Sequence, residues 1–104
     1  MVLNKEEYLD DVLAAFVEAG VTGATIIESL GMGRAIATDI PIFAALRRTL
    51  QHSHPHNLTL FAVVKDDGQV ERVISLIEKI INLDEPGTGI LFVLPVAKVL
   101  GLSL

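Results

Sequence analysis

The chain has 104 residues, enough for one domain with a single hydrophobic core but not for two. Its 8 Lys and Arg against 13 Asp and Glu give a net charge of −5, which excludes non-specific binding to nucleic-acid phosphates as its function. The hydrophobic fraction of 51% is high for so small a domain, and it predicts an oligomer that buries apolar surface between copies.

The first half of the chain predicts a strand, a helix and a second strand. A short strand at residues 1–3 is followed by a helix of about fifteen residues. The apolar side chains of one helix face are spaced i, i+3, i+4 and i+7: Leu9, Val12, Leu13 and Phe16. Asn4 is expected to cap this helix and Gly20 to end it. Residues 24–30 then read as a strand that ends in the turn "GMGR".

The second half repeats this plan. Residues 58–65 are rich in β-branched and aromatic side chains and predict a strand. The "DDG" that follows supplies capping chemistry for a helix. Its apolar side chains share one face: Val70, Val73, Ile74, Ile77 and Ile81. A "GTG" loop then leads into "ILFVL", a continuous apolar run that predicts a strand covered on both sides.

Two β-α-β halves of this kind predict an α+β fold, the ferredoxin-like split βαβ sandwich (β-α-β-β-α-β). In that fold a four-stranded antiparallel sheet carries both helices on one face. Residues 1–104 are therefore expected to form a single domain. The connection at about residues 35–57 separates the halves, and ordered connections of this length are typically functional.

The sequence resembles the P-II nitrogen-regulatory signal-transduction proteins. The stretch "LDDVLAAFVEAGVTGATIIESLGMGR" is similar to that family's first helix, second strand and the Gly-x-Gly-Arg at the base of its T-loop. The stretch "GTGILFVLPVAKVLGL" is similar to its B-loop, fourth strand and following segment. The resemblance implies a homotrimer with a T-loop at about residues 35–57 and adenine-nucleotide sites in the clefts between subunits. It also implies regulation of a partner protein, such as a transporter or an enzyme, rather than catalysis.

The two glycine loops form the candidate effector site: Gly31, Gly33, Arg34, Gly87, Thr88 and Gly89. Glycine lets backbone N–H groups approach an anion closely, and the Thr88 hydroxyl is a further donor. Arg34 can contact a phosphate or carboxylate with two hydrogen bonds. The alternative is that each loop is only a tight turn that serves the fold.

The chain departs from the family around the second loop. Asp84 and Glu85 precede the glycines, and Ile90 stands where the resemblance leads us to expect a lysine. An acidic loop without that lysine binds a triphosphate poorly, because nothing offsets its charge. If Arg34 supplies the positive charge, the expected effector among AMP, ADP and ATP is the monophosphate, or another small anion.

The histidines suggest a different function. His52, His54 and His56 are the only histidines, and an i, i+2, i+4 set in an extended segment points to one side. Such imidazoles suit zinc, copper or nickel, so a divalent metal-binding or metal-tolerance protein is the alternative. The competing interpretation is a polar loop, because Pro55 interrupts the pattern and no cysteine or carboxylate lies within a few residues.

The longest apolar runs are shorter than the roughly 20 residues that cross a bilayer, so no membrane span is expected. The acidic start "MVLNKEEYLDD" and the absence of cysteine favour a cytoplasmic protein. Without cysteine or a Ser-His-Asp pattern that specifies a nucleophile, the sequence does not predict an enzyme.

Overall fold

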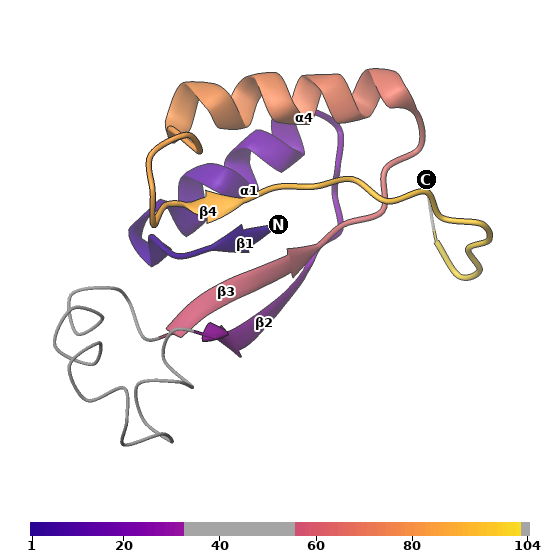
Figure 1. Ribbon diagram of the computed structural model, residues 1–104. Coiled ribbons are helices and arrows are strands. Elements are labelled where there is room, and N and C mark those ends of the chain that lie inside the picture. Colours follow the sequence, from indigo (N-terminus) through magenta and orange to yellow (C-terminus); the bar gives the residue numbers. More distant parts are fainter. Residues whose placement is uncertain (33–55, 103–104) are drawn as a thin grey trace, which may run out of the picture.

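The computed structural model describes residues 1–32 and 56–102 (Figure 1). The elements in chain order are β1 (Val2–Leu3), the 3-10 helix η1 (Glu6–Tyr8), α1 (Leu9–Glu18), β2 (Thr25–Leu30), β3 (His56–Phe61), α4 (Asp67–Ile80) and β4 (Gly89–Ile90). The four strands form one sheet in the order β2-β3-β1-β4, and every neighbouring pair is antiparallel. This order and alternation confirm the predicted α+β, ferredoxin-like fold.

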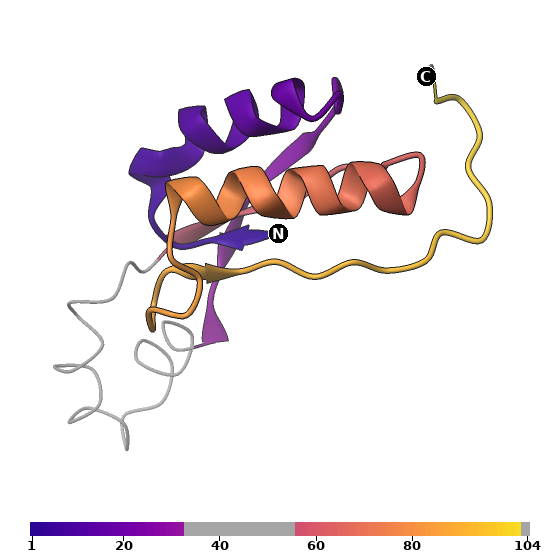
Figure 2. The ribbon, with the colours of Figure 1, turned by 90° about the horizontal axis from the view of Figure 1, so that it is seen from above.

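Helices α1 and α4 lie side by side over one face of the sheet, and among residues 1–32 and 56–102 no helix covers the other face (Figures 1 and 2). The hydrophobic core fills the space between the two layers. Its buried side chains are Leu3, Val12, Ala15, Phe16, Ala19, Val21, Leu58, Leu60, Val73, Ile77 and Ile81. Both predicted helix faces supply core residues, as the 3.6-residue period requires. In the described part of the chain, neither helix is long and apolar enough to cross a membrane.

Gln69 joins the end of α1 to the start of α4. Asp66 caps α4, because its Oδ1 accepts a hydrogen bond from the Gln69 backbone N–H at 2.8 Å. The buried Gln69 side chain donates to the carbonyl oxygen of Ala19 at 3.3 Å and accepts from the N–H of Lys65 at 2.9 Å. Gly20 has the left-handed φ of 88° that the sequence predicted for the end of the first helix. The expected capping chemistry is confirmed at these two positions.

The start of the first helix differs from the prediction. Asn4 does not cap it, and the chain instead forms η1, which has no side-chain cap, before α1 begins at Leu9. The Asn4 side chain accepts a hydrogen bond from Asn57 Nδ2 of β3 at 3.2 Å. The Asn4 side-chain oxygen, which would have capped the helix, is thus hydrogen-bonded to the side-chain amide of Asn57 instead. The sequence around Asn4 carries no signal for such a contact.

The last strand is much shorter than predicted. In β4, Ile90 pairs with Val2 and Gly89 pairs with Leu3. Residues 91–96 have no strand partner among the described residues, and the Phe92 and Leu94 side chains are 55% and 69% exposed. The ladder cannot extend because β1 offers only two residues for pairing. The prediction that "ILFVL" forms a strand covered on both sides is therefore wrong for the chain as described.

Candidate functional site

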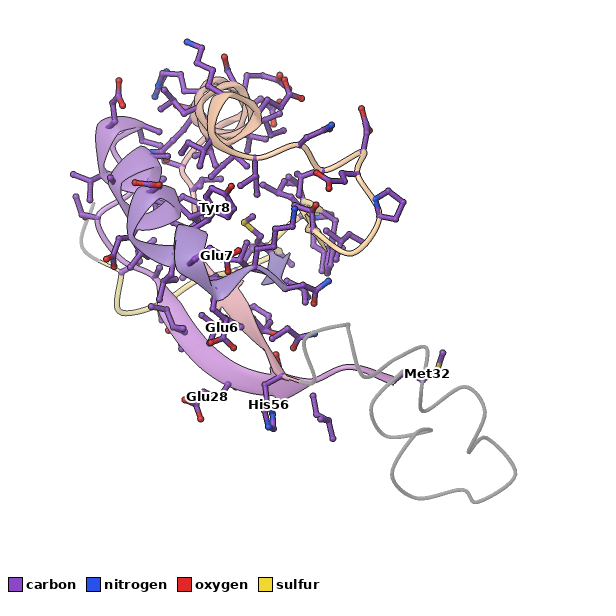
Figure 3. All side chains as sticks on the ribbon, turned by 90° about the vertical axis from the view of Figure 1, so that its left-hand side faces the viewer. Glu6, Glu7, Tyr8, Glu28, Met32 and His56 are labelled. Atoms are coloured by element: carbon purple, nitrogen blue, oxygen red, sulfur yellow. The ribbon has the colours of Figure 1, made fainter. Side chains whose placement is uncertain are left out.

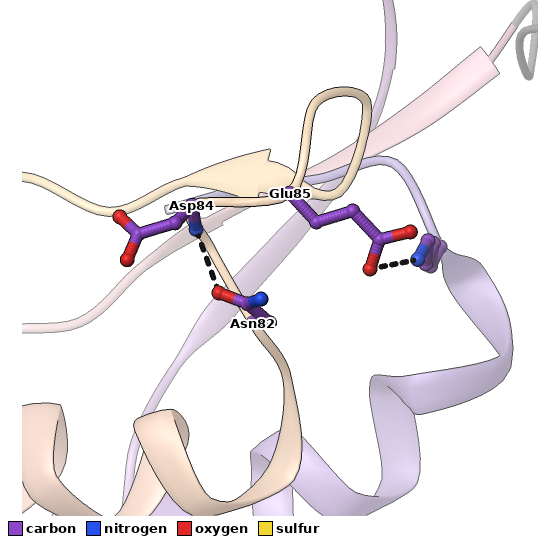
Figure 4. Close-up of polar contacts among 4 residues, drawn as sticks. Asn82, Asp84 and Glu85 are labelled. Carbon is purple, nitrogen blue, oxygen red and sulfur yellow. Dashed lines mark hydrogen bonds and ion pairs between the residues drawn. The ribbon is translucent and has the colours of Figure 1, made fainter.

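The loop between α4 and β4 is held by its own hydrogen bonds (Figure 4). The backbone N–H of Asp84 donates to Asn82 Oδ1 at 3.0 Å, and the N–H of Glu85 donates to the Asn82 carbonyl at 3.2 Å. The N–H of Thr88 then donates to the Glu85 carbonyl at 3.3 Å. These contacts set the path of the chain before the glycines, so a ligand would not have to order this segment.

The same loop is fastened to the residues that follow β1. The backbone N–H of Asn4 donates to the Thr88 carbonyl at 3.0 Å, and Lys5 Nζ lies 3.4 Å from Glu85 Oε2. The Lys5 side chain is 28% exposed, so the ion pair remains in contact with solvent. Lys5 therefore brings a positive charge to a loop that is acidic in sequence. Lys5 was not among the residues predicted from the sequence; the signal that could have indicated it is the predicted ferredoxin-like topology, in which the first and last strands are neighbours.

The two glycines of the loop have different roles. A Cβ on Gly89 would collide with the carbonyl oxygen of Val2, so glycine is needed there for β4 to approach β1. Gly87 has a left-handed φ of 81°, and a Cβ built on it would meet nothing within 4 Å. Gly89 is explained by the fold alone, whereas the space beside Gly87 is open to a ligand.

Thr88 lies between them with its side chain turned inward. It is 1% exposed, and its hydroxyl oxygen has no hydrogen-bond partner among the described residues. A hydroxyl in this orientation does not face an anion at the surface, and both backbone polar groups of Thr88 are already paired, with Glu85 and with Asn4. The exposed backbone at Gly87 is therefore the part of this loop that is open to an effector. An unpaired buried hydroxyl also costs stability, because it has lost its hydrogen bonds to water.

We predict that Thr88→Val raises the free energy of unfolding by about 1 kcal/mol, since valine has the same shape and no unpaired polar atom. Urea unfolding followed by circular dichroism measures this change. Thr88→Ser, which keeps the hydroxyl and removes a methyl group, is the matched control and should lower stability. A loss of stability in Thr88→Val would mean that the hydroxyl has a partner.

The first glycine loop begins at Gly31, directly after β2, beside a polar cluster on the sheet face opposite α1 and α4. Asn57 Nδ2 lies 3.5 Å from the position a Cβ would take on Gly31. The Ser29 hydroxyl bonds to the side-chain and backbone oxygens of Asn57 and lies 2.7 Å from Thr59 Oγ1. Asn57 in turn donates to Asn4, whose backbone holds Thr88. Hydrogen bonds thus connect the neighbourhood of Gly31 to the second loop.

The two loops lie at the same end of the sheet but at opposite edges. Gly31 follows β2 and Gly89 begins β4, and these are the outer strands of the order β2-β3-β1-β4 (Figure 1). Three strand spacings separate them, or ~14 Å at the usual distance between neighbouring strands. One chain therefore does not bring its two glycine loops into a single small site.

The remaining candidates are described only in part. His56 is the first residue of β3, where it pairs with Leu30, and its exposed side chain points away from the helices (Figure 3). His52, His54, Gly33, Arg34 and most of the 35–57 insertion lie outside the described residues. Within the described ranges, no group of three or more histidine, cysteine, aspartate or glutamate side chains is placed to hold a metal ion. The predicted histidine site thus stays a prediction.

The fold and these loops agree with a comparison to known protein families. The family model for nitrogen regulatory protein P-II matches residues 1–103 of this chain. The match covers both halves of the sandwich and includes both glycine loops. The chain therefore belongs to the nitrogen regulatory protein P-II family, a family of regulatory signal-transduction proteins.

Proposed function

We propose that this protein is a homotrimeric regulator that binds a small anionic effector in clefts between subunits and thereby controls a partner protein, such as a transporter or an enzyme. The observation that carries this proposal is the position of the glycine loops at one end of the sheet and at its opposite edges. Each chain then supplies two half-sites, and a complete site requires two chains.

A ring of copies joins these half-sites. In a head-to-tail interface, the β2 edge of one subunit faces the β4 edge of the next, and such an interface closes into a ring at a suitable rotation. Each cleft then contains Gly31, Gly33 and Arg34 from one subunit and the segment 87–89 from its neighbour. The exposed apolar side chains of both edges, among them Ile26 and Ile90, favour burial between copies.

The charges at the second loop indicate the class of effector. Asp84 and Glu85 repel anions, and Lys5 offsets only one of these carboxylates through its ion pair with Glu85. With Arg34 from the neighbouring subunit, the cleft carries two positive and two negative groups. This balance suits a monophosphate such as AMP better than ATP, because extra phosphate charge would remain uncompensated.

A thermal-shift panel tests the proposal. The ligands are AMP, ADP, ATP, 2-oxoglutarate and bicarbonate, with zinc, nickel and copper to test the histidine alternative. A ligand that binds only the native protein raises the unfolding midpoint as its concentration passes its Kd. We expect the largest shift at equal concentration from AMP. If no anion shifts the midpoint, the effector proposal is overturned, and a shift from metals alone favours the histidine site.

Charge variants locate the site. We predict that Glu85→Gln tightens AMP binding by about two- to fivefold, and that Lys5→Gln weakens it by a similar factor, since both groups are partly exposed. Arg34→Ala should weaken binding by about tenfold or more, because it removes a charge-assisted hydrogen bond. Isothermal titration calorimetry measures each Kd.

Arg72→Gln, which removes an exposed charge from α4, is the control and should leave the Kd unchanged. Equal effects from Arg72 and Lys5 would show only a change in net charge.

A further inference from the structure

The side chain of Asn57 joins three strands at the end of the sheet where both glycine loops lie (Figure 1). Its Nδ2 donates to Asn4 Oδ1 at 3.2 Å, and Asn4 directly follows β1. Its Oδ1 accepts from the Ser29 hydroxyl of β2, which also lies 3.2 Å from the Asn57 carbonyl oxygen. Asn57 itself belongs to β3. One amide therefore connects β1, β2 and β3.

The contact with Asn4 reaches further along the chain than backbone pairing does. The ladder between β1 and β3 ends with Leu3 opposite Leu58, so Asn4 lies just beyond its last pair. The Asn57 amide holds the chain at this point, before it turns into η1. Both side chains are half-buried, so water competes less for this hydrogen bond than for one at the surface.

The part of the second glycine loop that is open to an effector is a tight turn. The Thr88 N–H donates to the Glu85 carbonyl at 3.3 Å and closes it. Pro86 and Gly87 are the residue types that a type II turn favours at its central positions, and Gly87 has the positive φ, 81°, that this turn requires there. Such a turn keeps its own shape, but its position relative to the sheet depends on contacts at its two ends.

Both ends of this turn are attached to the residues that follow β1. Thr88, at its end, accepts from the Asn4 N–H at 3.0 Å. Glu85, at its start, places Oε2 3.4 Å from Lys5 Nζ. Since Asn57 fixes the chain at Asn4, it also fixes where these two attachments are made.

We propose that Asn57 is a positioning residue for the effector, because it sets the location of the turn at Gly87 through Asn4. The inference rests on the proposed function, and it adds a residue of β3 to those that determine affinity. Asparagine is unfavourable in strands, so strand preference does not explain its place in β3. Its hydrogen bonds to two neighbouring strands do. The competing role is a general contribution to stability, and the two roles predict different measurements.

Hydrogen exchange of single backbone amides, followed by NMR on the full chain, separates the two roles. Asn57→Leu keeps the approximate size of the side chain and removes its amide. We expect the Asn4 N–H to exchange about five- to tenfold faster in this variant, the factor that corresponds to the net contribution of one hydrogen bond. The amides at the centre of α4 should change little.

Thr59→Val is the matched control for this measurement. Thr59 Oγ1 lies in the same polar cluster, 2.7 Å from the Ser29 hydroxyl, but the link from Asn57 to Asn4 does not pass through it. This variant should leave the exchange rate of the Asn4 N–H unchanged. Equal acceleration at Asn4 and across α4 in Asn57→Leu would show only a general loss of stability, and it would overturn the positioning role, as would no acceleration at Asn4.

Titration of the same proteins with AMP, by isothermal titration calorimetry, measures the effect on binding. We expect Asn57→Leu and Asn4→Leu each to weaken AMP binding about three- to fivefold, since each removes the same hydrogen bond. The double variant should bind no more weakly than either single variant, because both substitutions act through one contact. Thr59→Val should bind AMP as the wild type does.

The outcomes separate this inference from the proposed function. Faster exchange at Asn4 with unchanged AMP affinity in Asn57→Leu overturns the positioning role and leaves the proposed function intact. If the wild type binds no anion, the proposed function is overturned, while the exchange rates still decide whether Asn57 positions the turn.

Discussion

Replacing Ile77 with alanine is expected to lower the free energy of unfolding by about 3–4 kcal/mol. Ile77 lies at the centre of the buried face of α4 and is 0% exposed, so truncation leaves a cavity between the helix layer and the sheet. Urea unfolding followed by far-UV circular dichroism measures the loss as a lower midpoint. All variants must be compared at one protein concentration, because the proposed assembly would contribute to apparent stability.

Val17→Ala is the control for this measurement. Val17 is also an apolar helix residue, but it is 64% exposed on α1, and its truncation should change stability by less than about 0.5 kcal/mol. Equal losses from the two variants would contradict the core described above. They would instead indicate that the exposed face of α1 is buried in the assembled protein.

A second large effect is expected at Gly89, where alanine should cost about 3 kcal/mol. The added Cβ would collide with the Val2 carbonyl oxygen, which is backbone and cannot move without opening the pairing of β1 with β4. Gly87→Ala should cost about 1–2 kcal/mol, because its φ of 81° is unfavourable for alanine but the space around it is open. Gly23→Ala meets no atom within 4 Å and should be nearly neutral.

These three glycine variants also separate a structural role from a binding role. Thermal unfolding measures stability, and titration with AMP measures binding in the same samples. We expect Gly87→Ala to reduce AMP binding more than its modest loss of stability implies, since the open space beside Gly87 faces the proposed effector. A Gly87→Ala protein that binds AMP as the wild type does would remove this residue from the site.

The parts of the fold that depend on local pattern could be predicted from the sequence. Helix α4 has an aspartate cap and an apolar face with a 3.6-residue period, and both signals are contained within the helix itself. The left-handed glycine after α1 is equally local. The length of β4 could not be predicted in this way, because it depends on how many residues β1 offers for pairing. Likewise, the hydrogen bond that the Asn4 side chain accepts comes from Asn57, which is 53 positions away in the sequence.

In the candidate site, too, the features that depend on local sequence could be predicted and those that depend on distant contacts could not. Paired glycines mark both loops in the sequence, but only the structure separates Gly89, which the sheet requires, from Gly87, which it does not. The sequence predicted that the Thr88 hydroxyl would contact the effector, but the structure buries this side chain. The direction of the side chain depends on strand register, which local sequence does not specify. The positive charge of Lys5 beside Glu85 depends on the junction of β1 with η1 lying against a loop that is distant in sequence.

The unpaired segment after β4 has a consequence for the life of a newly made chain. Extended apolar stretches with few charges are what chaperones and quality-control proteases bind, and residues 91–102 present such a stretch with a single lysine. If copies assemble as proposed and cover this segment, an assembled copy would hide the stretch and a surplus copy would keep displaying it. Surplus copies would then be degraded faster than assembled ones.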